Sequence, residues 1–305
     1  GATVPPRVGP SLAMHNPRVT IGIPVRNGES EIETCLACLS TQTFRDIAII
    51  VYDNASTDRT PEIVAAAMRN DPRIGYFRHE TNIGALPNFA AVLAAAKSPY
   101  FMWRAYDDLS GPDYIERLVA ALDAHPDAVL AAPRTETVRV QAGRCRVRLP
   151  PEPGTGPRGR LAAERWMIRR LQAGWFYGLY RREFLVEAMG FVGREFHFVW
   201  AWDFLLLAAT VLRARIVGVP EATFTHRLTG APKQYSSSEA TAERVALVRN
   251  YWHVLELLIA EKNMPLYQRL LHRAMFVRHV KRRVARWPVL LRAVKDSLSF
   301  PRSVS

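Results

Sequence analysis

The chain has 305 residues, of which 49% are hydrophobic and 23% are charged, and its formal net charge is +13. This is the composition of an ordinary globular protein, so a disordered or fibrous chain is excluded, and the length suffices for one large domain with an appendage. Residues 1–17 lack the apolar core of a signal peptide, and no stretch reaches eighteen uninterrupted apolar residues. We therefore expect no membrane-spanning segment.

The three cysteines, Cys35, Cys38 and Cys145, do not form a disulfide framework, which fits a reducing compartment. Cys35 and Cys38 have the spacing of a redox motif, but they fall inside a predicted helix, where residues three apart share one face. No second pair of cysteines is present to complete a metal site. We expect both side chains to pack in the core.

The positive charge is concentrated near the C-terminus. Residues 264–305 contain ten Lys or Arg and one Asp, a net charge of +9, which leaves +4 for the rest of the chain. Between Leu266 and Val284, apolar residues recur at helical spacing opposite a basic face. This pattern is typical either of a helix that lies on an anionic membrane or of a surface helix docked on its own domain. An anionic partner, a membrane or a nucleic acid, is predicted for this tail.

The first 130 residues alternate between predicted strands and helices. We predict strands at 19–25, 47–52, 74–77, 100–103 and near 129, and helices at about 30–41, from 60 onward, at 87–97 and from 113 to 125. Pro61 suits the first position of the second helix, which Thr60 can cap. Such alternation predicts a parallel sheet with right-handed crossover connections.

Polar side chains follow each of the first four strands, namely Arg26 and Asn27, Asp53, Asn82, and the adjacent pair Asp107 and Asp108. The carboxyl ends of parallel strands meet at one edge of a sheet, where ligands bind in open α/β folds. Paired carboxylates are hard oxygen ligands that suit Mg²⁺ or Mn²⁺ held against phosphate oxygens. The alternative is that Asp107 and Asp108 only cap the helix that begins near Pro112.

The stretch 134–160 is rich in Arg, Gly and Pro, and we predict a surface loop there. Gly154, Gly156 and Gly159 have the spacing of a dinucleotide fingerprint. We reject this match because prolines, and no strand, precede the glycines.

The second half of the chain contains two further candidate residues. We predict an aromatic strand at 175–180, an apolar helix at 204–212 and short strands at 216–219 and 223–225. Asp203 precedes the helix, and it is either the N-cap or, among its aromatic neighbours, a general base with a raised pKa. His226 follows the last strand and either completes a metal site or satisfies a loop carbonyl.

Taken together, these motifs resemble glycosyltransferase family 2, the inverting GT-A enzymes that use nucleotide-sugar donors. The resemblance covers about residues 19–230. It is carried by Ile23-Pro24-Val25-Arg26-Asn27, by Val51-Tyr52-Asp53-Asn54-Ala55-Ser56-Thr57-Asp58, by Asn82-Ile83-Gly84 and by the Asp107-Asp108 turn before Pro112.

This resemblance implies an α/β fold of the GT-A type, a Rossmann-like and mostly parallel sheet flanked by helices, with a C-terminal helical appendage. It implies a flexible lead at 1–17, a catalytic domain at 18–232 and a basic helical region at 233–305. Within the catalytic domain, the donor half would be about 18–132 and the acceptor half about 133–232.

The resemblance also implies roles for single residues. Asp203 would be the catalytic base, and Asp108, with Asp107 and His226, would bind Mn²⁺ or Mg²⁺. The donor would be bound by residues that end or follow the strands: Pro24, Val25, Arg26, Asn27, Asp53, Asn82, Gly84 and Asp107. The sequence departs from the family pattern at Ala105, where many relatives carry the first Asp of the motif, and at Trp202, where an acidic residue is usual.

The activity implied is metal-dependent, inverting transfer of a hexosyl or related group from a nucleoside diphosphate sugar, with a UDP-sugar favoured. The implied acceptor is a hydroxyl of a saccharide or lipid-linked saccharide, in bacterial surface polysaccharide assembly. No nucleic-acid partner is then expected, and the protein would be cytoplasmic or peripheral on the inner face of the plasma membrane, held there by its basic helices.

Two other classes of protein fit the same residues. One is a metal-dependent nucleotidyltransferase, and the other is a non-catalytic basic α/β protein that binds a membrane or a nucleic acid. The sequence has no acceptable dinucleotide fingerprint, no Walker motif and no Gly-x-Ser-x-Gly elbow, which argues against dehydrogenases, kinases and serine hydrolases.

Overall fold

The computed structural model describes residues 17–139, 143–150, 157, 159–228, 241–284 and 289. Residues 1–16 of the predicted lead and the tail beyond residue 289 lie outside this range. The chain forms two compact units. The first, which we call the sheet unit, comprises 1–154, 173–187 and 215–231, and the second, the helical unit, comprises 155–172, 188–214 and 232–305.

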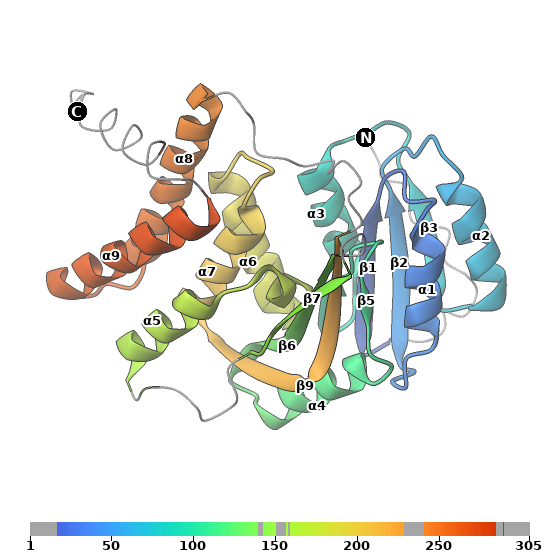
Figure 1. Cartoon of the computed structure of the whole chain (residues 1–305), viewed down its shortest axis with the longest axis horizontal. Helices are drawn as coiled ribbons and strands as arrows, with labels where there is room; N and C mark the ends of the chain where they lie inside the picture. Colours follow the sequence, from blue (N-terminus) through green and yellow to red (C-terminus); the bar gives the residue numbers. More distant parts are fainter. Residues whose placement is uncertain are drawn as a thin grey trace. The chain divides into compact units, whose positions relative to one another are not determined.

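The sheet unit is built on four parallel strands in the order β3-β2-β1-β4 (Figure 1). Their bounds are β1 (Val19–Val25), β2 (Ile47–Asp53), β3 (Ile74–Arg78) and β4 (Tyr100–Trp103). Every residue of β1 and β2 is buried, as expected for parallel strands that are covered on both faces. The predicted α/β fold and these four strands are confirmed.

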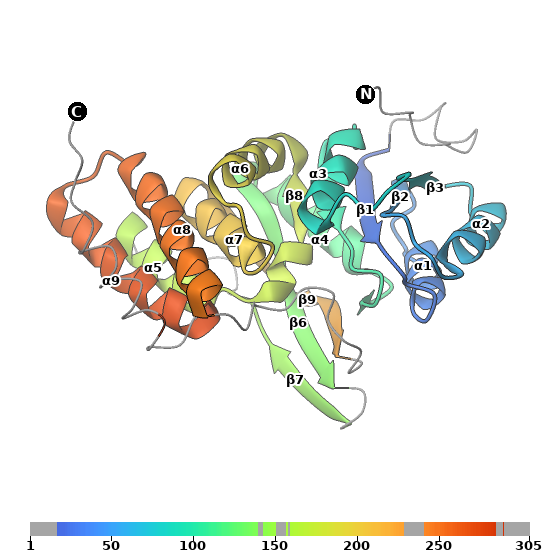
Figure 2. The same ribbon diagram turned by 90° about the horizontal axis from the view of Figure 1, so that it is seen from above.

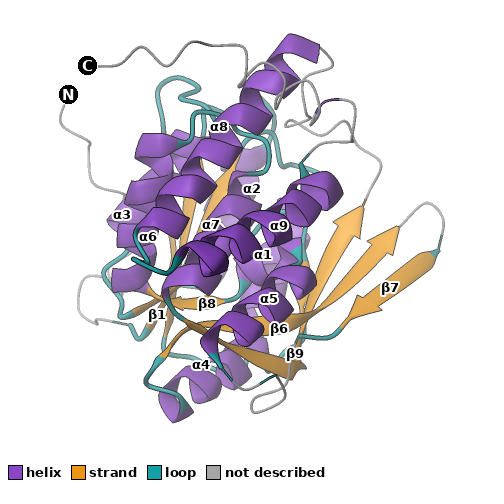
Figure 3. Ribbon diagram, turned by 90° about the vertical axis from the view of Figure 1, so that its left-hand side faces the viewer, coloured by secondary structure: helices purple, strands orange, loops and turns teal. Residues whose placement is uncertain are grey.

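Beyond β4 the sheet becomes mixed (Figure 3). β8 (Leu179–Arg181) is antiparallel to β4 and to β6 (Ala128–Arg139), which is parallel to β9 (Arg215–Leu228). β5 (Leu109–Ser110) and β7 (Arg144–Arg148) add antiparallel pairs to β9 and β6. The two short strands predicted near residue 220 are therefore one long strand, with a register shift opposite Pro133 and Arg134.

The surface loop predicted at 134–160 is wrong over its first half. Residues 134–139 continue β6, and 144–148 return as β7 to form a hairpin. The exposed, Arg-rich composition resembled a loop, although Cys145 and Val147 alternate with Arg144, Arg146 and Arg148 at the period of two that is typical of a strand. The aromatic strand predicted at 175–180 is likewise short, because residues 173–177 form the 3-10 helix η2 (Ala173–Tyr177).

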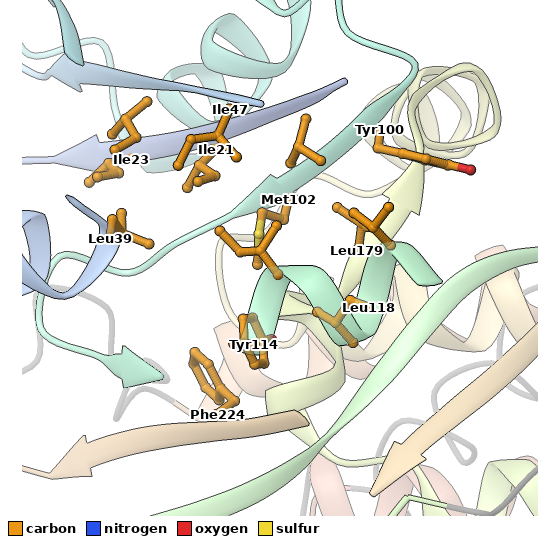
Figure 4. Packing of buried hydrophobic residues seen from close by; sticks show 14 of the residues in the cluster. Ile21, Ile23, Leu39, Ile47, Tyr100, Met102, Tyr114, Leu118, Leu179 and Phe224 are labelled. Carbon is orange, nitrogen blue, oxygen red and sulfur yellow. The ribbon is translucent and has the colours of Figure 1, made fainter. Parts of the chain in front are cut away.

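Helices cover both faces of the parallel strands. They are α1 (Ile32–Ser40), α2 (Thr60–Asn70), α3 (Ala85–Ala95) and α4 (Tyr114–Ala124). Alternate residues of β1, such as Ile21 and Ile23, pack in one core with Leu39 of α1 and Leu118 of α4 (Figure 4). On the opposite face, Trp103 stacks on Phe176 of η2 with ring centroids 4.7 Å apart. The buried Cys35 belongs to the first core, as predicted, but the prediction is wrong for Cys38, which is half-buried outside that core with its Sγ 3.3 Å from the Ser110 carbonyl oxygen.

The helical unit contains α5 (Arg160–Arg170), α7 (Trp202–Arg213), α8 (Thr241–Ala260) and α9 (Leu266–Arg283). α6 (Arg182–Glu195) begins in the sheet unit and ends in the helical unit. Figure 2 shows α5, α8 and α9 lying together. None of the described helices combines the length and apolar character that crossing a bilayer requires.

A buried carboxylate joins α5 to α9. Glu164 accepts a hydrogen bond from Lys262 Nζ at 2.6 Å and pairs with His272 Nε2 at 2.7 Å. Burial alone would raise the pKa of Glu164, but the hydrogen bonds from His272 and Lys262 outweigh burial and hold the pKa below its ordinary value of 4.5. The ionised form of Glu164 therefore stabilises this packing.

We predict that Gly178→Ala destabilises the protein, because the added Cβ would overlap the carbonyl oxygen of Ala131. Overpacking of this kind lowers the free energy of unfolding by about 1–3 kcal/mol. A Cβ added at Gly193 in α6 would meet no atom within 4 Å, so Gly193→Ala is expected to raise that free energy by up to about 1 kcal/mol. Urea denaturation of both variants measures the difference, and a Gly178→Ala variant as stable as wild type would contradict the close approach.

We also predict a pH-dependent effect of Glu164→Gln. Because the folded-state pKa is depressed, the contribution of Glu164 is fully present above pH 4.5 and is lost as the pH falls through the folded pKa. Removing one partner of a buried pair costs about 3–5 kcal/mol at neutral pH. Denaturation at pH 7 and in acid should show that the difference in the free energy of unfolding between this variant and wild type is smaller in acid. Glu256→Gln, which breaks an exposed pair with Arg273, is the control and should cost less than about 1 kcal/mol.

Candidate active site

The loops that follow the four parallel strands leave the sheet at one edge. Val25 at the end of β1 pairs with Asp53 at the end of β2, which in turn pairs with Arg78 at the end of β3. Beyond β4, the backbone N–H of Arg104 donates to the carbonyl of Gly22 at 2.9 Å. We call the loops 26–31, 54–59, 79–84 and 104–108 the rim. The predicted convergence of polar residues at this edge follows from the observed pairing.

Asp53 is fully buried beneath the rim. Its Oδ1 accepts a hydrogen bond from the backbone N–H of Ser56 at 2.8 Å, and its Oδ2 accepts one from the Tyr76 hydroxyl at 2.6 Å. The Arg78 guanidinium lies 3.8 Å from Oδ2. A carboxylate oxygen can accept two hydrogen bonds, so these contacts fix the group while leaving acceptor capacity on each oxygen.

Asn54 connects two loops of the rim, and its sequence context had indicated no role of its own. Its Nδ2 donates to Asn82 Oδ1 at 2.7 Å and to the Gly84 carbonyl at 3.1 Å, and its Oδ1 accepts from the Ile83 N–H at 2.8 Å. Gly84 has φ of 88°, a left-handed conformation that favours glycine. The predicted donor residues Asn82 and Gly84 are thus held by Asn54.

The loop after β1 is held against the loop after β2. The Asn27 N–H donates to Ser56 Oγ at 2.9 Å, and Asn27 Oδ1 accepts from the Thr57 N–H at 2.9 Å. Thr60 does not cap its helix, because its hydroxyl accepts from the Gly28 N–H at 2.8 Å and donates to Asp58.

The remaining donor residues predicted in this loop differ in accessibility. Pro24 and Val25 are buried within β1, so their side chains face the protein, whereas Arg26 is half-buried and Asn27 is exposed.

The turn that contains Asp107 and Asp108 is fastened to β9. Asp108 is buried, and its Oδ1 accepts from the backbone N–H of Arg227 at 2.9 Å. Leu109 pairs with Thr225 in an antiparallel register, so one step further along this register Asp108 lies opposite His226. The pairing brings the turn beside the stretch of β9 that contains His226, which therefore lies within a strand and not in a loop, and the metal assignment stays a prediction.

Burial, and next the neighbouring charge of Asp107, raise the pKa of Asp108 well above its ordinary range. The Arg227 N–H and the positive charges of Arg104 and Arg227 act in the opposite direction. Bringing a cation to this turn would favour the ionised carboxylate for the same electrostatic reason.

Arg104 is a residue of this site that the sequence had not revealed. It is fully buried, its guanidinium carbon lies 5.2 Å from the Tyr114 ring centre and 5.3 Å from that of Phe224, and its Nη2 donates to Ser110 Oγ at 2.9 Å. Its Nε and Nη1 have no hydrogen-bond partner among the described residues. A lone Arg between an apolar strand and two Asp residues was the signal that could have revealed it, because a charge at that position is costly to bury.

The residues at this turn fit a divalent cation whose coordination shell a phosphorylated substrate completes. Within the described ranges, no three His, Cys, Asp or Glu side chains are grouped closely enough to hold a metal by themselves. Mg²⁺ is commonly bound by only one or two carboxylates, with substrate phosphates and waters as the other ligands. Asp107 and Asp108 supply carboxylates of this type.

Asp203 lies in the helical unit, in the first turn of α7 and half-buried. The N-cap is Ala201, with φ of 68°, so the alternative that Asp203 caps the helix is wrong. Trp202 before it is buried. The assignment of Asp203 as the catalytic base stays a prediction.

Comparison with known proteins finds a match to the family model of glycosyl transferase family 2 over residues 20–184. The chain is 30% identical to EpsH of Bacillus subtilis over 118 residues, which are 38% of this chain and 34% of EpsH. It is 33% identical over 101 residues to the glycosyltransferase GlyA of Streptococcus pneumoniae, covering 33% of this chain and 14% of GlyA. The chain thus spans about a third or less of the length of these relatives.

Solved structures share the fold at low sequence identity. TarS of S. aureus (residues 1–349), in complex with UDP-GlcNAc, aligns with a TM-score of 0.66 and 20% identity over 87% of this chain and 72% of that one. GalNAc-T7, with UDP, GalNAc and Mn²⁺, aligns with a TM-score of 0.56 and 15% identity over 79% of this chain and 48% of that one. The GT-A fold expected from the sequence is confirmed.

We predict that Asn54→Ala loosens the rim, because it removes the hydrogen bonds that the Asn54 side chain makes with the Ile83 N–H, Asn82 Oδ1 and the Gly84 carbonyl. Because residues 82–84 are exposed or half-buried, each lost hydrogen bond is expected to cost about 0.5–1.5 kcal/mol. Hydrogen–deuterium exchange should show faster exchange of the amides of residues 82–84. Ser98→Ala, which removes a buried hydrogen bond to Thr20 at the opposite end of the strands, is the control. Equal exchange at 82–84 in both variants would contradict the role of Asn54.

Proposed function

Because the chain belongs to glycosyltransferase family 2, we propose that it transfers a sugar from a nucleoside diphosphate sugar to an acceptor hydroxyl, with inversion at the anomeric carbon. The observation that carries this proposal is the rim. Asp53 at the end of β2 and the Asp107–Asp108 turn after β4 lie at one edge of the sheet, within the stretch matched by the family. Nucleotides bind at that edge in open α/β folds.

The rim suits a UDP-sugar donor. Arg26 and Asn27 present polar groups beside the loop after β2, which the buried Asp53 holds from beneath through the Ser56 N–H. Asn82 and Gly84 would contact the nucleoside from the neighbouring loop, in the positions that Asn54 fixes. Pro24 and Val25 would contribute through their backbone, since their side chains are buried. The UDP and UDP-GlcNAc in the TarS structures support uracil as the nucleobase of the donor.

Asp107 and Asp108, with His226 of the neighbouring strand β9, would hold Mn²⁺ or Mg²⁺ together with the diphosphate. When bound, the cation supplies positive charge that offsets the charge growing on the departing nucleoside diphosphate. Mn²⁺ in the structures of GalNAc-T7 and of a mannosyltransferase from Pyrobaculum calidifontis supports this assignment.

Asp203 would act as the general base. Its carboxylate accepts the proton of the acceptor hydroxyl while the hydroxyl oxygen forms a bond to the anomeric carbon. The bond from that carbon to the diphosphate oxygen breaks in the same step, so the configuration inverts. The transition state has oxocarbenium character, so positioning and electrostatics supply most of the acceleration.

The acceptor that we propose is a saccharide or lipid-linked saccharide in bacterial surface polysaccharide assembly. The basic helices of the helical unit would then hold the protein, located in the cytoplasm, at the inner face of the plasma membrane. This part of the proposal is supported by the concentration of positive charge in residues 264–305.

A thermal-shift panel of nucleotide sugars and nucleoside triphosphates, with and without Mn²⁺, tests the donor. We expect a UDP-sugar with Mn²⁺ to raise the melting temperature most, by the linkage of binding to stability. Asp108→Asn should lose the Mn²⁺-dependent part of the shift. Asp127→Asn, which changes an exposed carboxylate paired with Arg215, is the matched control and should keep it.

The role of Asp203 as the general base is tested in the same samples by measuring the rate of UDP release in the presence of an acceptor saccharide. Asp203→Asn should keep the thermal shift but lower the rate at least about 100-fold, the contribution typical of general-base catalysis. Wild-type rates in this variant would contradict the assignment. A shift by nucleoside triphosphates alone would favour a nucleotidyltransferase, and no shift by any compound would overturn the proposed activity.

A further inference from the structure

We propose that one face of the helical unit is a docking surface for an anionic lipid bilayer, with its basic and apolar residues contributed by α5 and α9. This face, which we call the α5–α9 face, surrounds a cavity of about 320 Å³ between the two helices. The lining residues are Arg165, Ile168, Arg169, Leu271, Ala274, Met275, Arg278 and His279. The inference rests on the proposed function in one respect. A lipid-linked acceptor would explain why this protein docks on a membrane.

Three arginines at the cavity are available for an external anion. The side chains of Arg165, Arg169 and Arg278 make no hydrogen bond or ion pair within the part of the chain that the structure describes. Guanidinium groups bind phosphate oxygens in a forked, two-point geometry, so a cluster of three suits the phosphates of lipid headgroups.

No carboxylate opposes these cations on the two helices. α9 contains no Asp or Glu, and the only acidic residue of α5 is Glu164. Glu164 is buried and is paired with Lys262 and His272. The internal ion pair thus removes from the α5–α9 face the one negative charge that would repel an anionic surface.

Exposed apolar side chains continue from the cavity along the first turns of α9. Leu266, Tyr267 and Leu270 are 68%, 60% and 53% exposed. Leu271 is both exposed and part of the cavity lining, so it joins the apolar residues to the arginines. A helix that presents large apolar side chains beside Arg is typical of one that lies in the membrane interface.

The combination favours a bilayer over two other occupants. A nucleic acid would be bound by the arginines but would leave Leu266 and Leu270 in water. A second copy of the chain would bring its own arginines against these and supply no acidic residue from the same helices. An anionic bilayer accommodates the cations at its headgroups and the apolar side chains at the acyl boundary.

Vesicle co-sedimentation of the 305-residue protein tests the proposal, with phosphatidylcholine vesicles and with vesicles that contain about 30% phosphatidylglycerol at low and high salt. We expect binding to the anionic vesicles that weakens with salt. Replacing Arg165, Arg169 and Arg278 together by Gln should weaken binding at least about tenfold, since each surface cation contributes to attraction by the leaflet. Leu266→Ser with Leu270→Ser should weaken it independently of salt.

The matched control replaces three exposed arginines of the sheet unit, Arg69, Arg144 and Arg146, by Gln, which removes the same charge. Equal loss in the control, equal binding to neutral vesicles, or wild-type binding by the triple variant would overturn the proposal. A dimer that Leu270→Ser dissociates, or preferential binding of RNA, without vesicle binding would assign the face to those partners instead. The thermal shift by UDP-sugar and Mn²⁺ is unchanged in these variants if the face is separate from the rim, so a failure here is distinguishable from a failure of the proposed activity.

Discussion

The site depends on one hydrogen bond between distant parts of the chain, from the backbone N–H of Arg227 to the carboxylate of Asp108. This bond ties the turn that follows β4 to β9, a strand that comes more than a hundred residues later. The Arg227 side chain pairs in turn with Glu31, just before α1. The carboxylate is thus held by contacts that only the folded sheet can assemble.

The net charge at this turn is less negative than two adjacent carboxylates alone would make it. Arg104 is buried beside aromatic rings directly before the turn, and its charge opposes the effect of burial on Asp108. Ala105, next in sequence, stands where many members of the resembled family carry another Asp. The buried positive charge of Arg104 reduces the net negative charge that a divalent cation would meet at this turn.

Hydrogen bonds among its own loops hold the rim together. Several of the residues that make these bonds were not among those predicted to bind the donor. Asn54 holds the Asn82–Gly84 loop, and Ser56 and Thr60 hold the loop after β1. Such contacts let backbone groups keep one geometry before a ligand arrives, which reduces the entropy lost on binding. A comparable arrangement occurs in the helical unit, where Glu164 fixes helix packing and leaves the surrounding arginines accessible.

The sequence alone determined the elements whose patterns are local. Buried parallel strands appear as continuous apolar runs, so β1 to β4 and the polar residues after them could be read directly from the chain. The motifs at Asp53 and at Asp107–Asp108 could be recognised for the same reason, because each follows one of these apolar runs.

Only the tertiary structure decided which distant groups meet. The pairing of β9 with β5 brings the Asp108 turn beside the stretch of β9 that contains His226 and Arg227, and no local pattern encodes that register. The β6–β7 hairpin escaped prediction because its exposed, Arg-rich residues resemble a loop, and strand pairing is a property of two segments together. The burial of Arg104 and the pairing of Glu164 likewise depend on neighbours brought from elsewhere in the fold, since desolvation and Coulomb energies are set by surroundings in space and not by position along the chain.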